Sequence, residues 1–484
     1  MAKEVPAPMV RDTVCHDDGI RRRRERPVRP VMAAGRLLTP ALHVIASLVC
    51  LALLLFVSAT GLGPLPPLGP TFVPGTGVWT AGADAQLPKA ETIHGAGLQR
   101  AARVTFESNG VAHVQAATDT DLYWAIGYLH ARFRLFQMDL LRRQGESRLS
   151  QIVGPDALPV DRFEARLGLL RTAQAEWAAM PRSGEAAGAL QAYAQGVNAR
   201  IREDEAQSNL PLLFKMLDYH PSPWTPIDSL VIQGDMAQTL DFTDDPLDYA
   251  VYARTLGYTR TMQWFPVLPA NDPHGYDPGP YASLGLQPLL PQQGAATADS
   301  GAVAELLDSF GRLPAYVLHH GANSNNWAVG GAKTASGKPL LAGDPHLQQT
   351  LPAIWYQLEA NSPGYHFSGV SIPGLPVILI GHNRDIAWSL TNVQNQATLF
   401  YRERTDRAHP GQYYWKGAWR KMATLSSWPP SYVVREPGSR SRWADWCAHS
   451  EPPPAQRVAV VQMRARGKFA RTTYSVVARE EEST

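Results

Sequence analysis

One short segment carries side chains that could perform acyl-transfer chemistry. Ser324 lies in the run His320–Trp327 (HGANSNNW), directly after Asn323. A serine among asparagines is usually a turn residue, because these side chains bond to the nearby backbone. Ser324, however, follows a spacer-like stretch and opens a β-like run. Because a serine hydroxyl becomes a nucleophile when a base takes its proton, Ser324 is a candidate catalytic residue.

Further motifs lie on both sides of Ser324. Downstream stand Gly-Asp-Pro-His at 343–346, Pro-Gly-Leu-Pro at 373–376, Gly-His-Asn at 381–383 and Ala-Trp at 387–388. Upstream, residues 127–139 read GYLHARFRLFQMD. The Gly-x-Ser-x-Gly motif is missing, which argues against an α/β-hydrolase.

This ordered set resembles the penicillin acylase family of N-terminal-nucleophile hydrolases, from about Leu65 to about Met422. The family's β-subunit begins with Ser-Asn-x-Trp, which Ser324 to Trp327 match. The resemblance implies an α+β fold, a four-layer αββα sandwich with a mainly helical α-subunit region. It also implies an amide hydrolase precursor that cleaves itself between Asn323 and Ser324.

The resemblance implies a specific mechanism. The Ser324 hydroxyl attacks the carbonyl of Asn323, and an N-to-O acyl shift followed by hydrolysis frees the α-amino group of Ser324. That amine, with a reference pKa of about 7.7–8.0, can then serve as the base. The backbone N–H at Asn392 matches one oxyanion donor. The other donor, an Asn side chain paired with an Arg, lies beyond residue 484 in the family pattern.

Other site residues also follow from the resemblance. His346 matches a histidine near the nucleophile and is given a supporting role, with a structural hydrogen-bonded His as the alternative. For His382 a structural role in a turn is favoured. The acyl pocket maps onto apolar positions whose alternative is ordinary core packing: Met236, Leu240, Leu347, Leu379 and Ile380. A hydrophobic acyl group is therefore expected. Family substrates include β-lactam side-chain amides and acyl-homoserine lactones, and the sequence does not choose between them.

No metal or cofactor is expected. Many family members bind one calcium ion through carboxylates, and the matching positions here are Pro246, Gln396 and Leu399. Two of these have no side-chain oxygen, whereas calcium takes several oxygen ligands. A nearby acidic group, Asp244, Asp245 and Asp248, leaves that alignment arguable.

The N-terminal region predicts a membrane segment. Residues 41–63 are uncharged and long enough to cross a bilayer, and an arginine cluster precedes them. This polarity predicts a cytoplasmic N-terminus and an exported remainder. A retained signal anchor is favoured over a signal peptide cut after Ala59. The net charge of +2 offers no field for nucleic acid, and three cysteines give no disulfide framework.

The elements that position these residues follow from periodicity. Alternation over 102–116 around Asn109-Gly110 predicts a hairpin, and residues 119–149 and 161–205 read as helices. Asp139, Arg142 and Arg143 are expected on the polar face of the first helix. Short β-like runs are expected at 327–329, 339–342, 354–359, 366–370, 377–380 and 386–390.

Six segments result: a basic N-terminus (1–40), a transmembrane segment (41–63), an α-subunit-like region (64–266), a spacer propeptide (267–323), the start of a β-subunit (324–422) and an atypical tail (423–484). Because the tail has the composition of a GC-rich gene read out of frame, we hypothesise a frameshift near codon 422. The alternatives are an inactive truncated membrane-tethered remnant and a membrane-anchored binding module.

Overall fold

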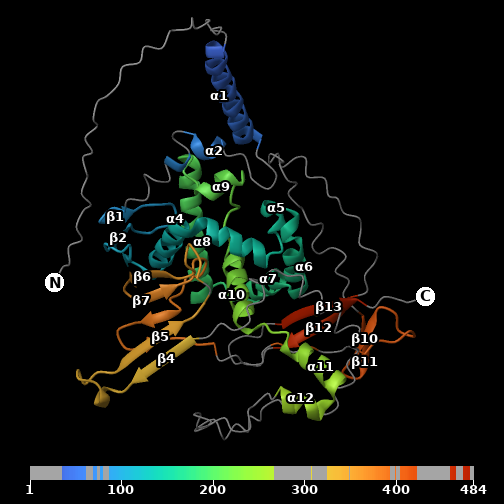
Figure 1. Ribbon diagram of the computed structural model, residues 1–484. Coiled ribbons are helices and arrows are strands. Elements are labelled where there is room, and N and C mark those ends of the chain that lie inside the picture. Colours follow the sequence, from blue (N-terminus) through green and yellow to red (C-terminus); the bar gives the residue numbers. More distant parts are fainter. Residues whose placement is uncertain are drawn as a thin grey trace, which may run out of the picture. The chain divides into compact units, whose positions relative to one another are not determined.

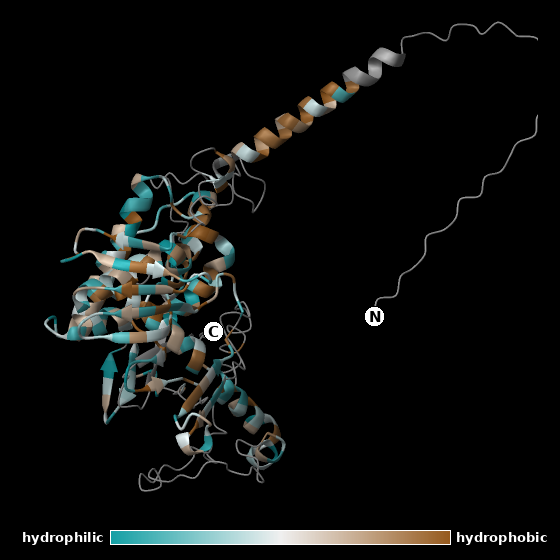
Figure 2. Cartoon of the chain, turned by 90° about the vertical axis from the view of Figure 1, so that its left-hand side faces the viewer, coloured by the Kyte–Doolittle hydropathy of each residue, from teal (hydrophilic) through white to brown (hydrophobic). Residues whose placement is uncertain are grey.

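The computed structural model describes residues 35–60, 69–73, 77–79, 87–265, 307, 324–347, 349–392, 398, 400, 404–421, 458–464 and 473–479. The chain divides into two compact units, Met1–Phe56 and Val57–Thr484. Helix α1, Gly35–Thr60, contains an 18-residue stretch, Leu42–Ala59, that is apolar enough to span a bilayer and is not buried. Its hydrophobic colouring is plain in Figure 2. The expected membrane-type helix is thus present, as an anchor or a signal sequence.

Helices dominate the region before residue 266, as predicted (Figure 1). They are α2 (Gly69–Phe72), α4 (Asp119–Gly145), α5 (Ser150–Val153), the 3-10 turn η1 (Pro155–Ala157), α6 (Leu158–Leu167), α7 (Leu169–Ala179), α8 (Glu185–Ala206), α9 (Leu212–Met216), α10 (Pro226–Asp241), α11 (Asp245–Leu256) and α12 (Tyr258–Trp264).

Helix α4 is the centre of this region. The Thr118 hydroxyl caps its start by accepting a hydrogen bond from the backbone N–H of Asp121 at 3.1 Å. It packs on α8 at very close range, since a Cβ at Gly127 would lie 2.2 Å from the carbonyl oxygen of Tyr193. Helix α4 also contacts α10 and strands β2, β3 and β6, so it joins the helices to the sheet. It ends at Gly145 rather than Leu149, because Ser147 adopts a left-handed backbone conformation.

The prediction that three charged residues lie on a solvent-exposed polar face of α4 is wrong. Asp139, Arg142 and Arg143 are buried, not solvent-exposed. The Asp139 carboxylate accepts hydrogen bonds from Arg142 Nε at 2.9 Å and from Arg143 Nε at 2.7 Å. Helix α10 and the loop before it contact this triplet, because Arg142 donates to the Ser222 and Pro223 carbonyls and pairs with Asp228. Ion pairing compensates for the loss of water. Sequence periodicity marks charged residues as exposed and does not register such pairing.

A seven-stranded sheet combines segments from both sides of Ser324. Its order is β1 (Ala90–Ile93), β2 (Ala102–Phe106), β3 (Ala112–Gln115), β6 (Tyr356–Asn361), β7 (His366–Ser371), β8 (Ile380–His382) and β9 (Ala387–Trp388). The predicted hairpin at Asn109-Gly110 joins β2 to β3, with Gly110 at a φ of 87°. Strand β3 pairs in parallel with β6, and the other neighbours are antiparallel.

Three two-stranded sheets complete the described strands. They pair β4 (Ser324–Val329) with β5 (Leu340–Pro345), β10 (Gln412–Trp415) with β11 (Ala418–Lys421), and β12 (Val458–Arg464) with β13 (Thr473–Arg479). The β-like runs predicted after Ser324 therefore overlap strands β4 to β9, with bounds that agree best in β7. The run predicted at 377–380 shares only Ile380 with β8. The α+β class is confirmed. The spacer, apart from residue 307, lies outside the described residues, as does the tail apart from β12 and β13.

A buried acid in α10 predicts a pH-dependent stability. Asp235 accepts a hydrogen bond from Gln144 Nε2 at 3.1 Å, and burial raises its pKa from 3.8 to about 7. A raised folded-state pKa stabilises the fold below the unfolded pKa, and this contribution is lost as pH rises through about 7. We expect Asp235→Asn to gain stability relative to the parent as pH rises from 4 to 8, by up to about 4 kcal/mol. Denaturant unfolding across that pH range measures it.

The exposed Asp385→Asn change is the matched control and should show no such trend. An Asp235→Asn difference that stays constant with pH would contradict the assignment of a buried neutral carboxyl.

Candidate active site

Ser324 begins strand β4, at the edge of the described residues. Its Cα is paired with Pro345, and the antiparallel register runs on to Val329 opposite Leu340. The connection is held by the Thr334 hydroxyl, which donates to the carbonyl of Lys338 at 2.7 Å. Asn323 lies outside the described residues. Ser324 is thus half-buried and lies at the end of the hairpin away from the 330–339 connection.

His346 lies one residue beyond the partner of Ser324. Its Nε2 lies 2.7 Å from an Asp344 carboxylate oxygen, and its side chain is 45% exposed. The register therefore brings His346 to the same end of the hairpin as the predicted nucleophile, as the sequence suggests. Its catalytic role stays a prediction.

A side-chain contact joins the nucleophile strand to the segment after β9. The Ser389 hydroxyl donates to Asn326 Oδ1 at 2.8 Å. Asn326 is two residues beyond Ser324, on the same face of β4. A Cβ at Gly343, the residue opposite Asn326, would lie 1.7 Å from Ser389 Oγ, so the glycine is what permits this approach. The contact brings the segment carrying Asn392 toward β4.

Asn392 itself is anchored on α10. Its Nδ2 donates to the carbonyl oxygen of Leu240 at 2.6 Å. Close by in the fold, the Thr398 hydroxyl donates to the carbonyl of Asp241 at 3.0 Å. Both bonds satisfy carbonyls in the last turn of α10, which have no partner within the helix. The predicted oxyanion segment and one predicted acyl-pocket residue therefore lie together.

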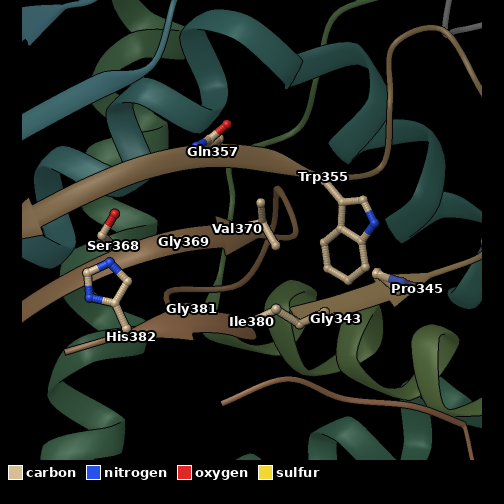
Figure 3. Close-up of a pocket in the computed structure, with 10 residues that line it drawn as sticks. All are labelled: Gly343, Pro345, Trp355, Gln357, Ser368, Gly369, Val370, Ile380, Gly381 and His382. Carbon is tan, nitrogen blue, oxygen red and sulfur yellow. The ribbon is translucent and has the colours of Figure 1, made fainter. Parts of the chain in front are cut away.

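A pocket of about 430 Å³ lies between β5 and the β6–β8 part of the sheet (Figure 3). The indole of Trp355 extends from the start of β6 toward β5, and His382 lies beside Ser368. The residues that line the pocket are Gly343, Pro345, Trp355, Gln357, Ser368, Gly369, Val370, Ile380, Gly381 and His382. His382, for which the sequence favours a structural role in a turn, is the last residue of β8 and lines the pocket. Trp355 and Gln357 are not among the site residues predicted from the sequence. The alternation of apolar and polar residues along β6 could have placed both on the same face of the sheet.

The predicted acyl-pocket residues only partly gather in the described structure. Ile380 lines the pocket. Met236 and Leu379 pack against the main hydrophobic core, which agrees with the alternative of core packing. Met236 and Leu240 lie one turn apart on α10, and Leu347 follows β5 with its N–H bonded to the Pro345 carbonyl at 3.0 Å.

The acidic group beside the expected calcium position is compact. Carboxylate oxygens of Asp244, Asp245 and Asp248 lie within 4.8 Å of one another. Pro246 lies between them and offers no side-chain oxygen, while Gln396 and Leu399 are outside the described residues. Three carboxylates are the hard donors that calcium takes. The expectation of no calcium therefore stays a prediction.

The penicillin amidase family model matches residues 101–427 of this chain, which include α4, α10 and the hairpin that begins at Ser324. The chain belongs to the penicillin amidase family. The match includes helices before Ser324 and the strands after it as far as β11. The motifs on the two sides of Ser324 therefore belong to the same family domain.

Curated relatives in the penicillin amidase family are acylases. The chain is 29% identical over 334 residues to acyl-homoserine lactone acylase QuiP of Pseudomonas aeruginosa, covering 69% of this chain and 38% of that protein. It is 29% identical to penicillin acylase 2 proenzyme of Pseudomonas sp. strain SE83, covering 61% and 37%. It is 26% identical to penicillin G acylase of Escherichia coli, covering 66% and 42%. The chain thus spans about two fifths of these relatives' length.

A solved structure of thermostable penicillin G acylase from Alcaligenes faecalis also matches. The TM-score is 0.32 at 22% identity, with 40% of this chain and 98% of that chain covered.

Proposed function

We propose that this chain is the precursor of an amide hydrolase that cleaves itself before Ser324 and then hydrolyses N-acyl amides through an acyl-Ser324 ester. The observation that carries the proposal is the pairing of Ser324 with Pro345 in the β4–β5 hairpin, within a family match that extends on both sides of Ser324. A chain end at this residue would leave the paired strand intact.

The proposed chemistry uses Ser324 for attack and for proton transfer, and the Asn392 backbone as one oxyanion donor. The α-amine of Ser324 takes the hydroxyl proton, and the oxygen attacks the substrate carbonyl. The tetrahedral intermediate collapses to an ester as the amine leaves with a proton, and water then hydrolyses the ester to the free acid. The backbone N–H at Asn392 stabilises the oxyanion. No step uses a metal or cofactor.

The composite sheet supports a two-chain product. Strand β3 pairs with β6 from Ala112 opposite Leu358 to Gln115 opposite Asn361. These strands lie on opposite sides of the proposed cleavage point. Cleavage therefore leaves α and β chains joined by a hydrogen-bonded ladder and a shared core.

Substrate and location follow by the same reasoning. The pocket side chains Trp355, Val370 and Ile380 favour a hydrophobic acyl group. The relatives named for penicillin and for acyl-homoserine lactones define the two substrate classes to test. The N-terminal helix would tether the catalytic part outside the cytoplasm.

Trapping of the acyl-enzyme tests the proposal. The chain is mixed with a phenylacetyl or a fatty-acyl 4-nitroanilide, quenched in acid and digested. We expect release of 4-nitroaniline and an acyl adduct on the peptide that begins at Ser324. An adduct on another residue, or no release with either amide, would contradict the proposal.

The anchor of Asn392 gives a second prediction. In Asn392→Ala the bond to the Leu240 carbonyl is lost, and the segment carrying the proposed oxyanion donor can shift. We expect kcat to fall by about 10–100-fold, since misplacement of about 1 Å costs on the order of 10² in rate. Steady-state kinetics measures it, with Asn383→Ala as the control in a neighbouring turn. An unchanged kcat would show that this anchor does not position the donor.

A further inference from the structure

A chain of hydrogen bonds runs through the core from α8 to the end of β7. The N–H of Gly374 donates to the Tyr193 hydroxyl at 2.8 Å, and that hydroxyl lies 2.9 Å from His130 Nδ1. At the other end, His130 Nε2 lies 2.9 Å from Ser371 Oγ, which donates to the carbonyl of Tyr356 at 3.1 Å. His130 and Ser371 are completely buried, as is Tyr193.

The proton on each atom follows from counting donors. Ser371 has one hydroxyl proton and gives it to Tyr356, so His130 must donate to it from Nε2. Burial lowers the pKa of His130 to about 3, so the imidazole is neutral and its Nδ1 is an acceptor. Tyr193, which accepts from Gly374, then gives its own proton to Nδ1. Every hydrogen bond in the series then has one donor and one acceptor.

Two members of this series, Ser371 and Gly374, fix the start of one segment. Ser371 is the last residue of β7, and residues 372–379 connect it to β8. Within that segment Gly374 has a φ of 114°, and a Cβ there would lie 2.4 Å from Ile232 Cδ1. Ile232 is one helical turn before Met236 on α10 and two turns before Leu240. The segment leads directly to Leu379 and to Ile380, a pocket residue.

We propose that His130 and Tyr193 are positioning residues that hold segment 372–379 against α10 and thereby set which acyl groups the site accepts. The inference rests on the proposed function. Neither residue reaches the pocket lining in the described structure. They act from the α-chain side of the proposed cleavage point on a segment from the β-chain side, so this discrimination depends on both chains.

The test compares Tyr193→Phe and Ser371→Ala with the intact parent chain in detergent. Tyr128→Phe is the control, because it removes a hydroxyl from the same α4–α8 interface, where Tyr128 bonds to Glu203 instead. Each test variant removes two buried hydrogen bonds of the series, and we therefore expect hydrogen exchange in residues 372–380 to increase at least about tenfold in both. Exchange in α4 should stay slow, which shows that the chain remains folded.

The second readout is the ratio of kcat/KM for phenylacetyl and dodecanoyl 4-nitroanilides. We expect this ratio to move toward one by up to about tenfold in the test variants, because a loosened pocket discriminates less between acyl groups. Unchanged exchange in 372–380 with α4 protected would overturn the proposal. Increased exchange with an unchanged ratio would overturn the specificity role. A parent inactive on both amides contradicts the proposed function, while the exchange data still decide the positioning role.

Discussion

In the Ser324→Ala variant we expect neither self-cleavage nor amide hydrolysis. The hydroxyl is the proposed nucleophile in both reactions, so its removal should leave a single uncleaved chain. Loss of the serine nucleophile lowers kcat by about 10⁶-fold in a protease that uses one, so activity should reach background here. Gel electrophoresis and 4-nitroaniline release measure the two effects separately.

Ser336→Ala is the matched control. Ser336 lies in the same β4–β5 connection, and its hydroxyl makes only local contacts among the described residues, with the Lys338 N–H at 3.3 Å and the Thr334 hydroxyl at 3.5 Å. It should cleave and turn over like the parent. If Ser324→Ala still cleaved at this position, or if both variants lost activity equally, Ser324 would not be the nucleophile.

The second large effect is expected in the stability of the helical region. Asp139 is the shared partner of Arg142 and Arg143 and also accepts a hydrogen bond from the Tyr219 hydroxyl at 2.9 Å. Burial by itself would raise the pKa of Asp139, but the two guanidinium groups outweigh it and lower that pKa. Asp139→Asn leaves two buried cations undercompensated, and we expect the free energy of unfolding to fall by about 3–5 kcal/mol.

Denaturant unfolding of the intact chain in detergent measures this loss, with Asp156→Asn as the control. Asp156 is exposed, so its replacement should change the free energy of unfolding by less than about 0.5 kcal/mol. The lowered pKa also means that the Asp139 contribution is lost as pH falls through the folded-state value. If Asp139→Asn lowers the free energy of unfolding only slightly at neutral pH, the ion pairs of Asp139 with Arg142 and Arg143 do not stabilise the helical region as proposed.

The sequence predicts the local elements of this fold well and their tertiary contacts poorly. Turn chemistry at Asn109-Gly110 and the helical period of α4 are local signals, and both elements form. The exposure of Asp139 is mispredicted because its burial depends on cover from Tyr219 in the loop before α10 and on its ion pairs with Arg142 and Arg143, which hydrophobic periodicity does not register. The parallel pairing of β3 with β6 joins residues more than 240 positions apart, and periodicity carries no information about it.

The candidate site shows the same division. The motif around Ser324 predicts the nucleophile, and the register of β4 with β5 brings His346 to the same end of the hairpin. The Ser389–Asn326 contact and the Asn392 anchor on α10 depend on how the segments meet in space. The hydrogen-bond series through His130 likewise joins α4, α8 and β7, and only coordinates reveal it.

The central claim is that Ser324 becomes a chain end that carries its own base. The most direct measurement is the intact mass and N-terminal sequence of the products formed by the purified chain. We predict a fragment that begins Ser-Asn-Asn-Trp with a free α-amine and a second fragment that ends at or before Asn323. A chain that stays whole, or a cut at any other position, would contradict the claim.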